Sequence, residues 1–342
     1  MTGANGDLVA DVLTLSKRHH EVAGVEAPLT ASRSRPARGL AKTFRGTLVW
    51  YSFIAPPFVL ILLFVAYPTF ETFWDSFFAQ SGAGQQFVGL EQYRRLGTSD
   101  VFWQVLGNTI LLGVAYLVIA IPLATVLASL LNRVRRGAAA LKVIYFLPQL
   151  TSSVAVAIMF NYIFQPDWGL LNGILRQFGI DDLPLWLADP RLDFTGSRAA
   201  VTLLAVWTGL GYFILIVLAG LQGIQADLYD AAAIDGANPL QTWWHITLPG
   251  LRPTFIFLIM TGIVDALARF GDLWTLGGPG GAPARSLQTI VMFMFQAGFE
   301  SGDINLASAT AVVFFCLVLI ATLIAFRGLL AREFAAQRGG RG

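Results

Sequence analysis

Charge, histidine and cysteine are scarce in this chain. Of its 342 residues, 13% are charged, three are histidine and one is cysteine. His19 and His20 lie in a polar N-terminal region and His245 in a later polar segment, so no apolar run holds a histidine that could bind a metal or act as a buried base. This scarcity excludes intramembrane metalloprotease and Cys–His chemistry, and Cys316 alone forms no internal disulfide.

A nucleotide-binding loop is missing as well. The chain has no Gly-x-x-x-x-Gly-Lys-Ser/Thr pattern, and its glycine-rich run at 277–281 lacks the lysine and predicts a turn. If ATP and Mg²⁺ are used, another chain must bind them. We therefore expect a non-catalytic protein with no metal or cofactor of its own. We also expect no nucleic acid, because basic residues near apolar spans usually set membrane topology.

Long apolar runs are what the chain has in their place. Hydrophobic residues make up 55% of it, and its mean hydropathy is +0.63. A helix of about 20 apolar residues crosses a bilayer. Six segments are long and apolar enough: Leu48–Phe70, Val105–Leu131, Val143–Pro166, Ala199–Ala226, Pro253–Leu276 and Ile304–Phe326. They predict an all-α polytopic membrane protein with six transmembrane helices.

The distribution of Lys and Arg predicts the orientation. If both termini are cytoplasmic, the inner segments hold 16 of these residues and the outer ones hold 6, and short basic loops stay in the cytoplasm. Residues 1–47 then form a disordered basic tail, 48–327 the transmembrane domain and 328–342 a second cytoplasmic tail. The first apolar run starts too late and is too long for a cleavable signal, so we expect it to remain as a span.

A polar segment, Asp230–Pro249, interrupts the apolar runs within the predicted cytoplasmic loop 223–252. Its signals predict a short helix over about Ala226–Ile234, a turn at Gly236, and a second helix that begins after an Asn238 cap and ends at Pro249.

The charge of this segment bears on what it contacts. Between Gly223 and Leu251 the only basic residue is His245, against three aspartates. Anionic lipid is then a poor partner, and a groove on another protein is a better one. The apolar face expected to enter such a groove comprises Trp243, Trp244, Ile246 and Leu248. The alternative, a loop that only packs under its own bundle, stays open on these residues.

Polar residues inside two spans are candidates for substrate contact. Asp265, Arg269 and Asp272 fall on one face of the fifth span, where they could line a polar path or hold the bundle together through an Asp265–Arg269 ion pair. In the fourth span, the run Trp207-Thr208-Gly209-Leu210-Gly211-Tyr212 combines aromatic rings that suit sugars with glycines that allow close approach or local unwinding. Interfacial anchoring is the alternative for its aromatic residues.

The sequence also resembles a known family, the membrane permeases of ATP-binding-cassette sugar importers of the maltose and glycerol-3-phosphate type. That family's loop signature is Glu-Ala-Ala, three residues, Gly, nine residues, Ile-x-Leu-Pro. This chain carries Asp230-Ala231-Ala232, Gly236 and Ile246-Thr247-Leu248-Pro249 with the spacing intact and Asp in place of Glu. Further matches include Asn108-Thr109, Phe146-Leu-Pro148 and Gly277-Gly-Pro279.

The resemblance implies a type I importer permease in a bacterial plasma membrane. Its partners would be a second, similar permease in a heterodimer, two ATPase subunits that bind ATP and Mg²⁺, and an extracytoplasmic binding protein that delivers a sugar. The residues Asp230, Ala231, Ala232, Gly236, Ile246, Leu248 and Pro249 would form a coupling helix that docks on an ATPase subunit. Trp207, Gly209 and Tyr212, with Thr208, would contact substrate. Asp265, Arg269 and Asp272 are further candidates for substrate contact, and the reason is only that they lie on one face of the fifth span.

Two rival functions stay open. The first keeps the importer but changes its cargo to glycerol phosphate, phosphonate or polyamine. A lining with two acids and one arginine favours a neutral, hydroxyl-rich solute over a phosphorylated one. The second is an ion-coupled secondary transporter, which predicts an internal repeat that the sequence does not show.

Overall fold

The computed structural model describes residues 51–81, 84–189 and 196–339, and side chains as far as Arg327. The predicted tail 1–47 lies outside these residues, as do 340–342 at the end of the second predicted tail. The chain divides into two units at Leu63. The described part of the first unit, 51–63, is helical and its side chains are exposed. Everything below concerns the second unit, from Phe64 onward.

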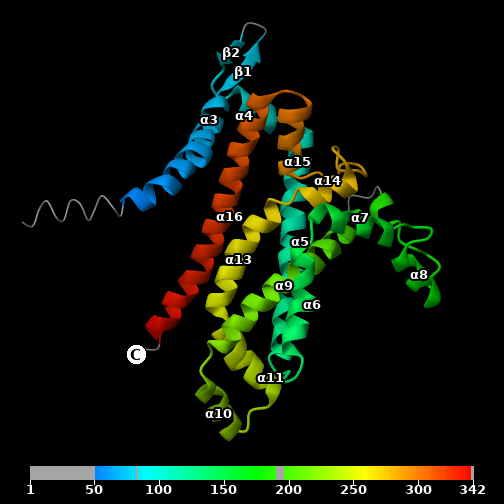
Figure 1. The fold of residues 1–342 in the computed structure, drawn as a ribbon, viewed down its shortest axis with the longest axis vertical. Coiled ribbons are helices and arrows are strands. Elements are labelled where there is room, and N and C mark those ends of the chain that lie inside the picture. Colours follow the sequence, from blue (N-terminus) through cyan, green and yellow to red (C-terminus); the bar gives the residue numbers. More distant parts are fainter. Residues whose placement is uncertain (1–50, 82–83, 190–195, 340–342) are drawn as a thin grey trace, which may run out of the picture. The chain divides into compact units, whose positions relative to one another are not determined.

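The second unit is built almost entirely of helices (Figure 1). Its first α-helix is α3 (Tyr67–Asp75). A two-stranded antiparallel hairpin follows, which consists of β1 (Phe78–Ser81) and β2 (Gly84–Phe87), and in it Phe78 pairs with Phe87. The remaining helices are α4 (Glu91–Gly97), α5 (Asp100–Leu131), α6 (Ala138–Leu150), α7 (Ser153–Ile163), α8 (Leu170–Gln177), α9 (Ser197–Gln222), α10 (Ala226–Ile234), α11 (Pro239–Thr242), α12 (Leu248–Gly250), α13 (Arg252–Leu267), α14 (Gly271–Gly277), α15 (Ile290–Phe295) and α16 (Ile304–Gly339).

The apolar helices are long enough to cross a bilayer. Within the described residues, five helices pass by length and hydropathy, and the count reaches six if the bent pair α6 and α7 is one span. The prediction of an all-α membrane protein is confirmed. The predicted count of six spans is reached if α6 and α7 form one span, and two of the predicted spans are interrupted.

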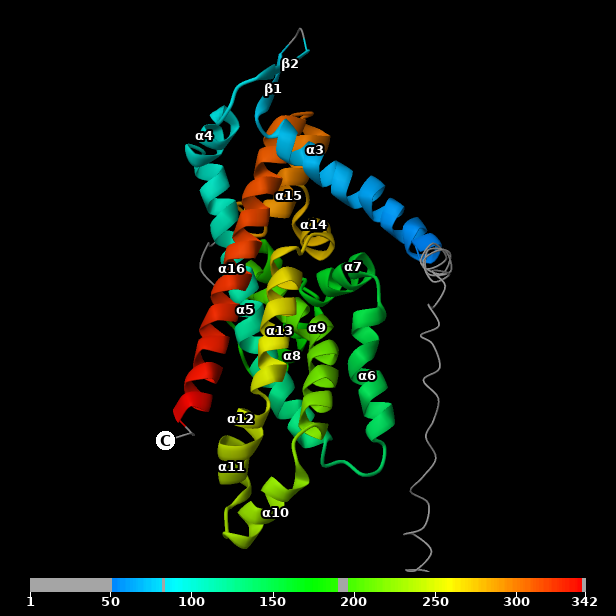
Figure 2. The ribbon, with the colours of Figure 1, turned by 90° about the vertical axis from the view of Figure 1, so that its left-hand side faces the viewer.

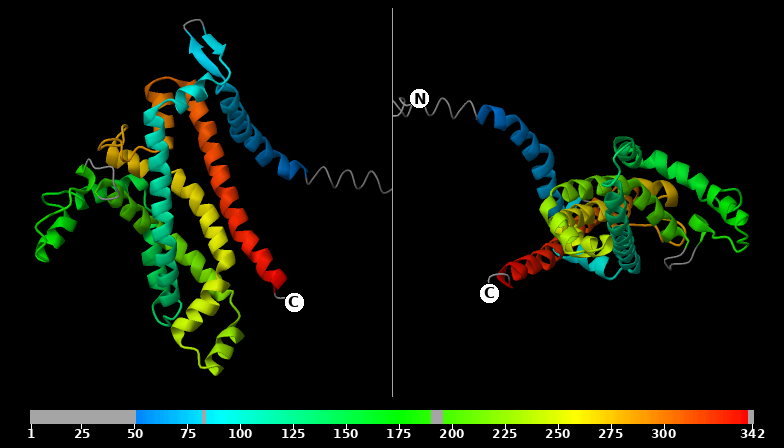
Figure 3. Two further views of the ribbon diagram at one scale, coloured as in Figure 1. Left: turned by 180° about the vertical axis from the view of Figure 1, so that it is seen from behind. Right: turned by 90° about the horizontal axis from the view of Figure 1, so that it is seen from below.

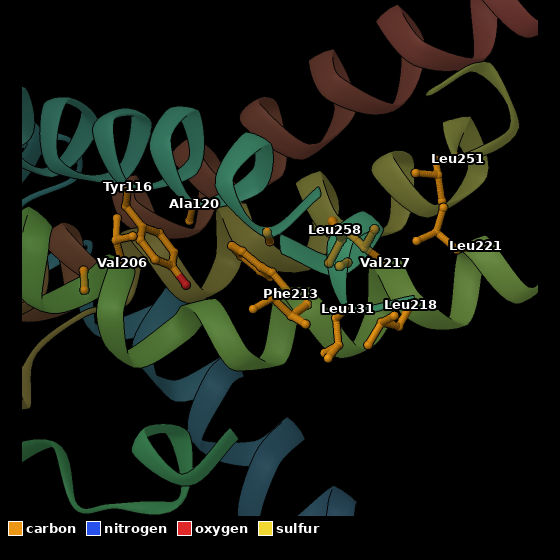
Figure 4. Packing of buried hydrophobic residues seen from close by; sticks show 14 of the residues in the cluster. Tyr116, Ala120, Leu131, Val206, Phe213, Val217, Leu218, Leu221, Leu251 and Leu258 are labelled. Carbon is orange, nitrogen blue, oxygen red and sulfur yellow. The ribbon is translucent and has the colours of Figure 1, made fainter. Parts of the chain in front are cut away.

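The core of the bundle forms where α5, α9 and α13 pack together (Figure 4). Ala120, Ala124 and Ala128 recur every fourth residue on α5 and are fully buried, so one face of this helix is smooth and the neighbouring helix can come close. On α9, a Cβ added to Gly211 would lie 2.0 Å from the Tyr145 carbonyl oxygen of α6. Small residues therefore set the helix spacing in this unit.

The third predicted span, Val143–Pro166, is not one helix. α6 and α7 meet at an angle of 97°. Pro148 near the end of α6 has no N–H for the helix ladder, and Thr151 and Ser152 leave the helical conformation, with ψ of 143° and 129°. A proline inside an apolar run is typical of a kink or a helix start, but it does not indicate a turn of this size.

The fifth predicted span, Pro253–Leu276, is also broken. α13 ends at Leu267 and α14 begins at Gly271, with Phe270 at φ −138°, ψ −62°. An added Cβ on Gly271 would lie 2.8 Å from the Ser153 side-chain oxygen, so α14 packs closely on α7. Asp265 lies in α13, Arg269 in the break and Asp272 in α14, so the three residues do not share one regular helix.

Different elements lie at the two ends of the second unit. The helices α10 and α11 lie at one end, and the β1–β2 hairpin with α4 and α15 lies at the opposite end (Figures 2 and 3). The interrupted regions between α6 and α7 and between α13 and α14 lie between these ends, beside each other (Figure 2).

Candidate functional site

A polar cavity forms where the two helix breaks meet. Its volume is about 260 Å³. The lining residues come from α5, the α6–α7 break, α9 and the α13–α14 break: Tyr116, Pro148, Gln149, Thr151, Ser153, Leu204, Ala205, Thr208, Gly209, Asp265, Ala268, Arg269, Phe270, Gly271 and Asp272. Irregular backbone at membrane depth is tolerated where it lines a cavity, because lipid cannot satisfy its polar groups. The cavity therefore explains how the two irregular segments are tolerated inside the bundle.

The three ionisable residues of the fifth span all line this cavity, in an arrangement that the sequence did not predict. Arg269 Nη2 donates to Asp272 Oδ2 and, at 3.3 Å, to the Val201 carbonyl oxygen. The alternative of an Asp265–Arg269 ion pair was wrong, because the break turns Arg269 toward Asp272. Asp272 lies in the first turn of α14, where the helix dipole favours a negative charge.

The two fourth-span aromatic residues lie outside the cavity. Thr208 and Gly209 line it, whereas Trp207 and Tyr212 do not. The Trp207 ring contacts the Phe160 ring of α7 with centroids 5.3 Å apart. The centroid of the Tyr212 ring lies 5.8 Å from that of the Phe213 ring. Of the two options that the glycines allow, local unwinding is absent, since α9 runs unbroken from Ser197 to Gln222.

The close approach predicted for this glycine region is present. A Cβ on Gly209 would lie 2.0 Å from the Tyr116 hydroxyl oxygen. Glycine here therefore lets the phenol of α5 reach the cavity.

Several polar residues of the cavity were missed by sequence reasoning. Tyr116, Gln149, Thr151 and Ser153 all line it. The run Thr151-Ser152-Ser153, which begins three residues after Pro148 inside an otherwise apolar segment, was the available signal for a break with polar side chains. Tyr116 sits in a long apolar run and gave no such signal.

A buried network at the hairpin end holds the 284–289 loop. Asn108, which is 1% exposed, donates through Nδ2 to the carbonyl oxygens of Arg285 (2.6 Å) and Gln288 (3.0 Å), and its Oδ1 accepts from Arg198 Nη2 at 2.5 Å. Thr289 Oγ1 donates to the Arg269 carbonyl oxygen at 3.2 Å. This loop thus contacts the α13–α14 break beside the cavity.

At the other end of the unit, the polar segment folds as the sequence predicted. α10 spans Ala226–Ile234, and Gly236 adopts φ 74°. The Ala237 N–H donates to the Ala232 carbonyl at 2.9 Å, which is the Schellman arrangement that favours glycine at this position. Asn238 caps α11 in a capping box with Gln241.

The second helix of this segment continues past its predicted end. After α11, a π-helical turn (Trp243–Thr247) leads directly into α12, and the Leu248 N–H donates to the Trp243 carbonyl. Leu248 keeps helical angles, φ −62° and ψ −45°, although Pro249 follows it, and α12 runs to Gly250. The prediction that the helix stops at Pro249 was therefore wrong.

The apolar face of the segment also differs from the expected one. Trp243 Nε1 donates to Ser129 Oγ of α5 at 3.1 Å, and Ile246, Leu248 and Pro249 are half-buried, so only Trp244 of the predicted face is exposed. The exposed apolar residues are Leu228, Ile234, Leu240 and Trp244. We call these four residues, with the exposed acids Asp227, Asp230 and Asp235, the loop surface. Of the signature residues, Asp230, Ala231 and Gly236 are exposed and Ala232 is half-buried.

The described part of the chain holds no group of three or more His, Cys, Asp or Glu side chains placed to bind a metal. The expectation of no metal rests on the scarcity of histidine in the sequence.

Comparison with known proteins places the chain in a family. Residues 120–335 match the family described as the binding-protein-dependent transport system inner membrane component. The chain belongs to this family. The permease is 33% identical to the probable ABC transporter permease YurN of Bacillus subtilis over 81% of this chain and 92% of that protein. It is 30% identical to the lactose transport system permease LacF of Rhizobium radiobacter over 86% of this chain and 99% of that protein.

A solved structure shares the permease fold. The crystal structure of a bacterial ABC transporter involved in the import of the acidic polysaccharide alginate includes a chain that aligns with a TM-score of 0.74 and 23% identity, covering 85% of this chain and 98% of that one. The resemblance to importer permeases inferred from the loop signature is thus confirmed at the level of family and fold.

Proposed function

We propose that this permease carries a sugar or oligosaccharide across a bacterial plasma membrane by alternating access, powered by ATPase subunits that dock on the loop surface. An extracytoplasmic binding protein delivers the sugar, and a second, similar permease completes the path. The observation that carries the proposal is the polar cavity at the two helix breaks, enclosed in a bundle that otherwise presents apolar side chains.

The chemistry of the cavity suits a polyol. Hydroxyl, amide, carboxylate and guanidinium groups line it together with the Tyr116 phenol, so a sugar finds donors and acceptors at several points. Arg269 Nη1 is buried without a hydrogen-bond partner. Unsatisfied buried donors are rare and gather at functional sites, which supports a role for this residue in binding. Trp207 and Tyr212 remain candidates for sugar contact outside the cavity.

Relatives support a carbohydrate as the cargo. LacF is named for lactose, and a permease of Bacillus subtilis that is 32% identical, AraP, is named for arabinooligosaccharides. A relative in Agrobacterium fabrum that is 29% identical is named for sn-glycerol-3-phosphate, so a phosphorylated cargo is the second candidate.

The geometry of the loop surface supports coupling. The Trp243–Ser129 hydrogen bond ties the second helix of the segment to α5, and contact between the Tyr229 and Thr247 hydroxyls at 3.2 Å ties α10 to that second helix. A force applied to the loop surface by a docked subunit therefore reaches α5, whose middle lines the cavity at Tyr116.

The test is uptake by the assembled transporter. The permease, its partner permease, ATPases and binding protein from the neighbouring genes are reconstituted in proteoliposomes and supplied with labelled lactose, arabinobiose, glycerol 3-phosphate and spermidine. We expect ATP-dependent uptake of a sugar. Uptake of spermidine alone, or uptake that needs an ion gradient instead of ATP, contradicts the proposal.

A further inference from the structure

The charged groups of the cavity differ in how accessible they are. Arg269 and Asp272 pair with each other, and their side chains are only 11% and 10% exposed. Asp265, in the last turn of α13, is exposed toward the cavity. A molecule that enters the cavity therefore meets one accessible charge, and it is negative.

The Arg269–Asp272 pair does not neutralise the charge of the Asp265 carboxylate. With all three groups ionised, one positive and two negative, this lining carries a net charge of −1. Arg269 is held through Nη2 by Asp272 and by the Val201 carbonyl, so its positive charge is already balanced by a carboxylate, and its remaining donor Nη1 is buried.

The hydrogen-bonding capacity of Asp265 points in the same direction. An ionised carboxylate only accepts hydrogen bonds, and sugar hydroxyls can donate them. A carboxylate, phosphate or sulfonate on the cargo would instead meet Asp265 as a like charge at low effective dielectric, which is costly.

We propose that this cavity takes a sugar that bears no acidic group, and that Asp265 determines this specificity by accepting hydrogen bonds from cargo hydroxyls and repelling anionic cargo. The inference rests on the proposed function and narrows it. It separates this permease from relatives whose names specify acidic cargo, such as the sn-glycerol-3-phosphate permease and the alginate transporter.

The experiment compares neutral and acidic sugars on the assembled transporter. The two permeases and the ATPases are placed in lipid nanodiscs without nucleotide and titrated calorimetrically with lactose, arabinobiose and cellobiose, and with cellobiouronate and a mannuronate disaccharide. We expect a neutral probe to bind at least about tenfold more tightly than either acidic probe, a factor typical of one uncompensated like-charge contact. In the Asp265→Asn variant the acidic probes gain affinity and the difference shrinks to within about threefold.

The matched control is Asp182→Asn, which removes an exposed carboxylate that does not line the cavity. This variant should retain the wild-type preference. Acidic probes that bind as tightly as neutral ones in the wild type, a preference that survives Asp265→Asn, or an equal change in the control would each overturn the assignment to Asp265. If no sugar of either kind binds, the proposed function itself fails, which is a different result from a sugar-binding transporter with no charge preference.

Discussion

Gly236 illustrates how one residue can control the loop surface. Its φ of 74° lies in the left-handed region, yet a Cβ there would meet no atom within 4 Å. Only the backbone conformation demands glycine, and an alanine costs about 1–2 kcal/mol there. The strain lowers the population of the native turn relative to other loop conformations by a factor of roughly 5 to 30, so we expect Gly236→Ala to reduce ATP-driven uptake. Gly236→Asn should retain more activity, since asparagine tolerates this conformation. Equal uptake by wild type and Gly236→Ala in proteoliposomes would rule out this role.

Single residues were predicted from the sequence where a local rule governs them. The cap at Asn238 and the turn at Gly236 follow from chemistry within a few residues of chain, and both were correct. The partner of Arg269 was not predictable in this way, because it depends on a break in α13 that changes the spacing between neighbours. Trp243 was predicted on the exposed face because its hydrogen bond to Ser129, 114 positions away in the sequence, cannot be inferred from the residues around it.

At the scale of helices, hydropathy identified the apolar segments but not their interruptions. A window of apolar residues has the same mean hydropathy whether the helix is straight or bent by 97°, as it is between α6 and α7. What fixes the bend is packing: α14 lies on α7 through Gly271, and both breaks open to one cavity. The cavity was therefore half predicted, through Thr208, Gly209 and the charged residues of the fifth span, while the half supplied by Gln149, Thr151 and Ser153 was missed.

The loop at 284–289 is held to α5 by one buried side chain, and this gives a prediction for an element. In Asn108→Leu the carbonyls of Arg285 and Gln288 lose their donor, which costs about 3 kcal/mol or more for buried groups. We expect the amides of this loop to exchange with deuterium markedly faster in the assembled transporter. Asn172→Leu is the control: Asn172 is equally buried and donates to the carbonyls of Pro166 and Pro184, away from this loop. Unchanged exchange in Asn108→Leu, or the same acceleration in both variants, would show that Asn108 does not hold the loop.

For the whole molecule, the decisive expectation is that substrate movement and ATP hydrolysis are linked through the loop surface. Ile234 is 86% exposed at the end of α10, next to Asp235 and the turn at Gly236. An isoleucine so exposed contributes nothing to this chain's own core, so a charge at this position should leave the fold intact and harm only a complex that buries it. In Ile234→Asp we expect normal membrane insertion, loss of the ATPase subunits on purification, and uptake reduced at least tenfold for a buried contact worth about 1.4 kcal/mol or more.

The control for this experiment is Ile180→Asp, which places the same charge at an exposed isoleucine outside the loop surface. It should assemble and transport as the wild type does. The permease purified without partners should hydrolyse no ATP, because its sequence has no phosphate-binding loop. If Ile234→Asp retains its ATPase subunits and its uptake, energy enters through another surface, and the acidic segment from Asp230 to Pro249 only packs under its own bundle. If both variants lose uptake alike, added surface charge alone explains the defect.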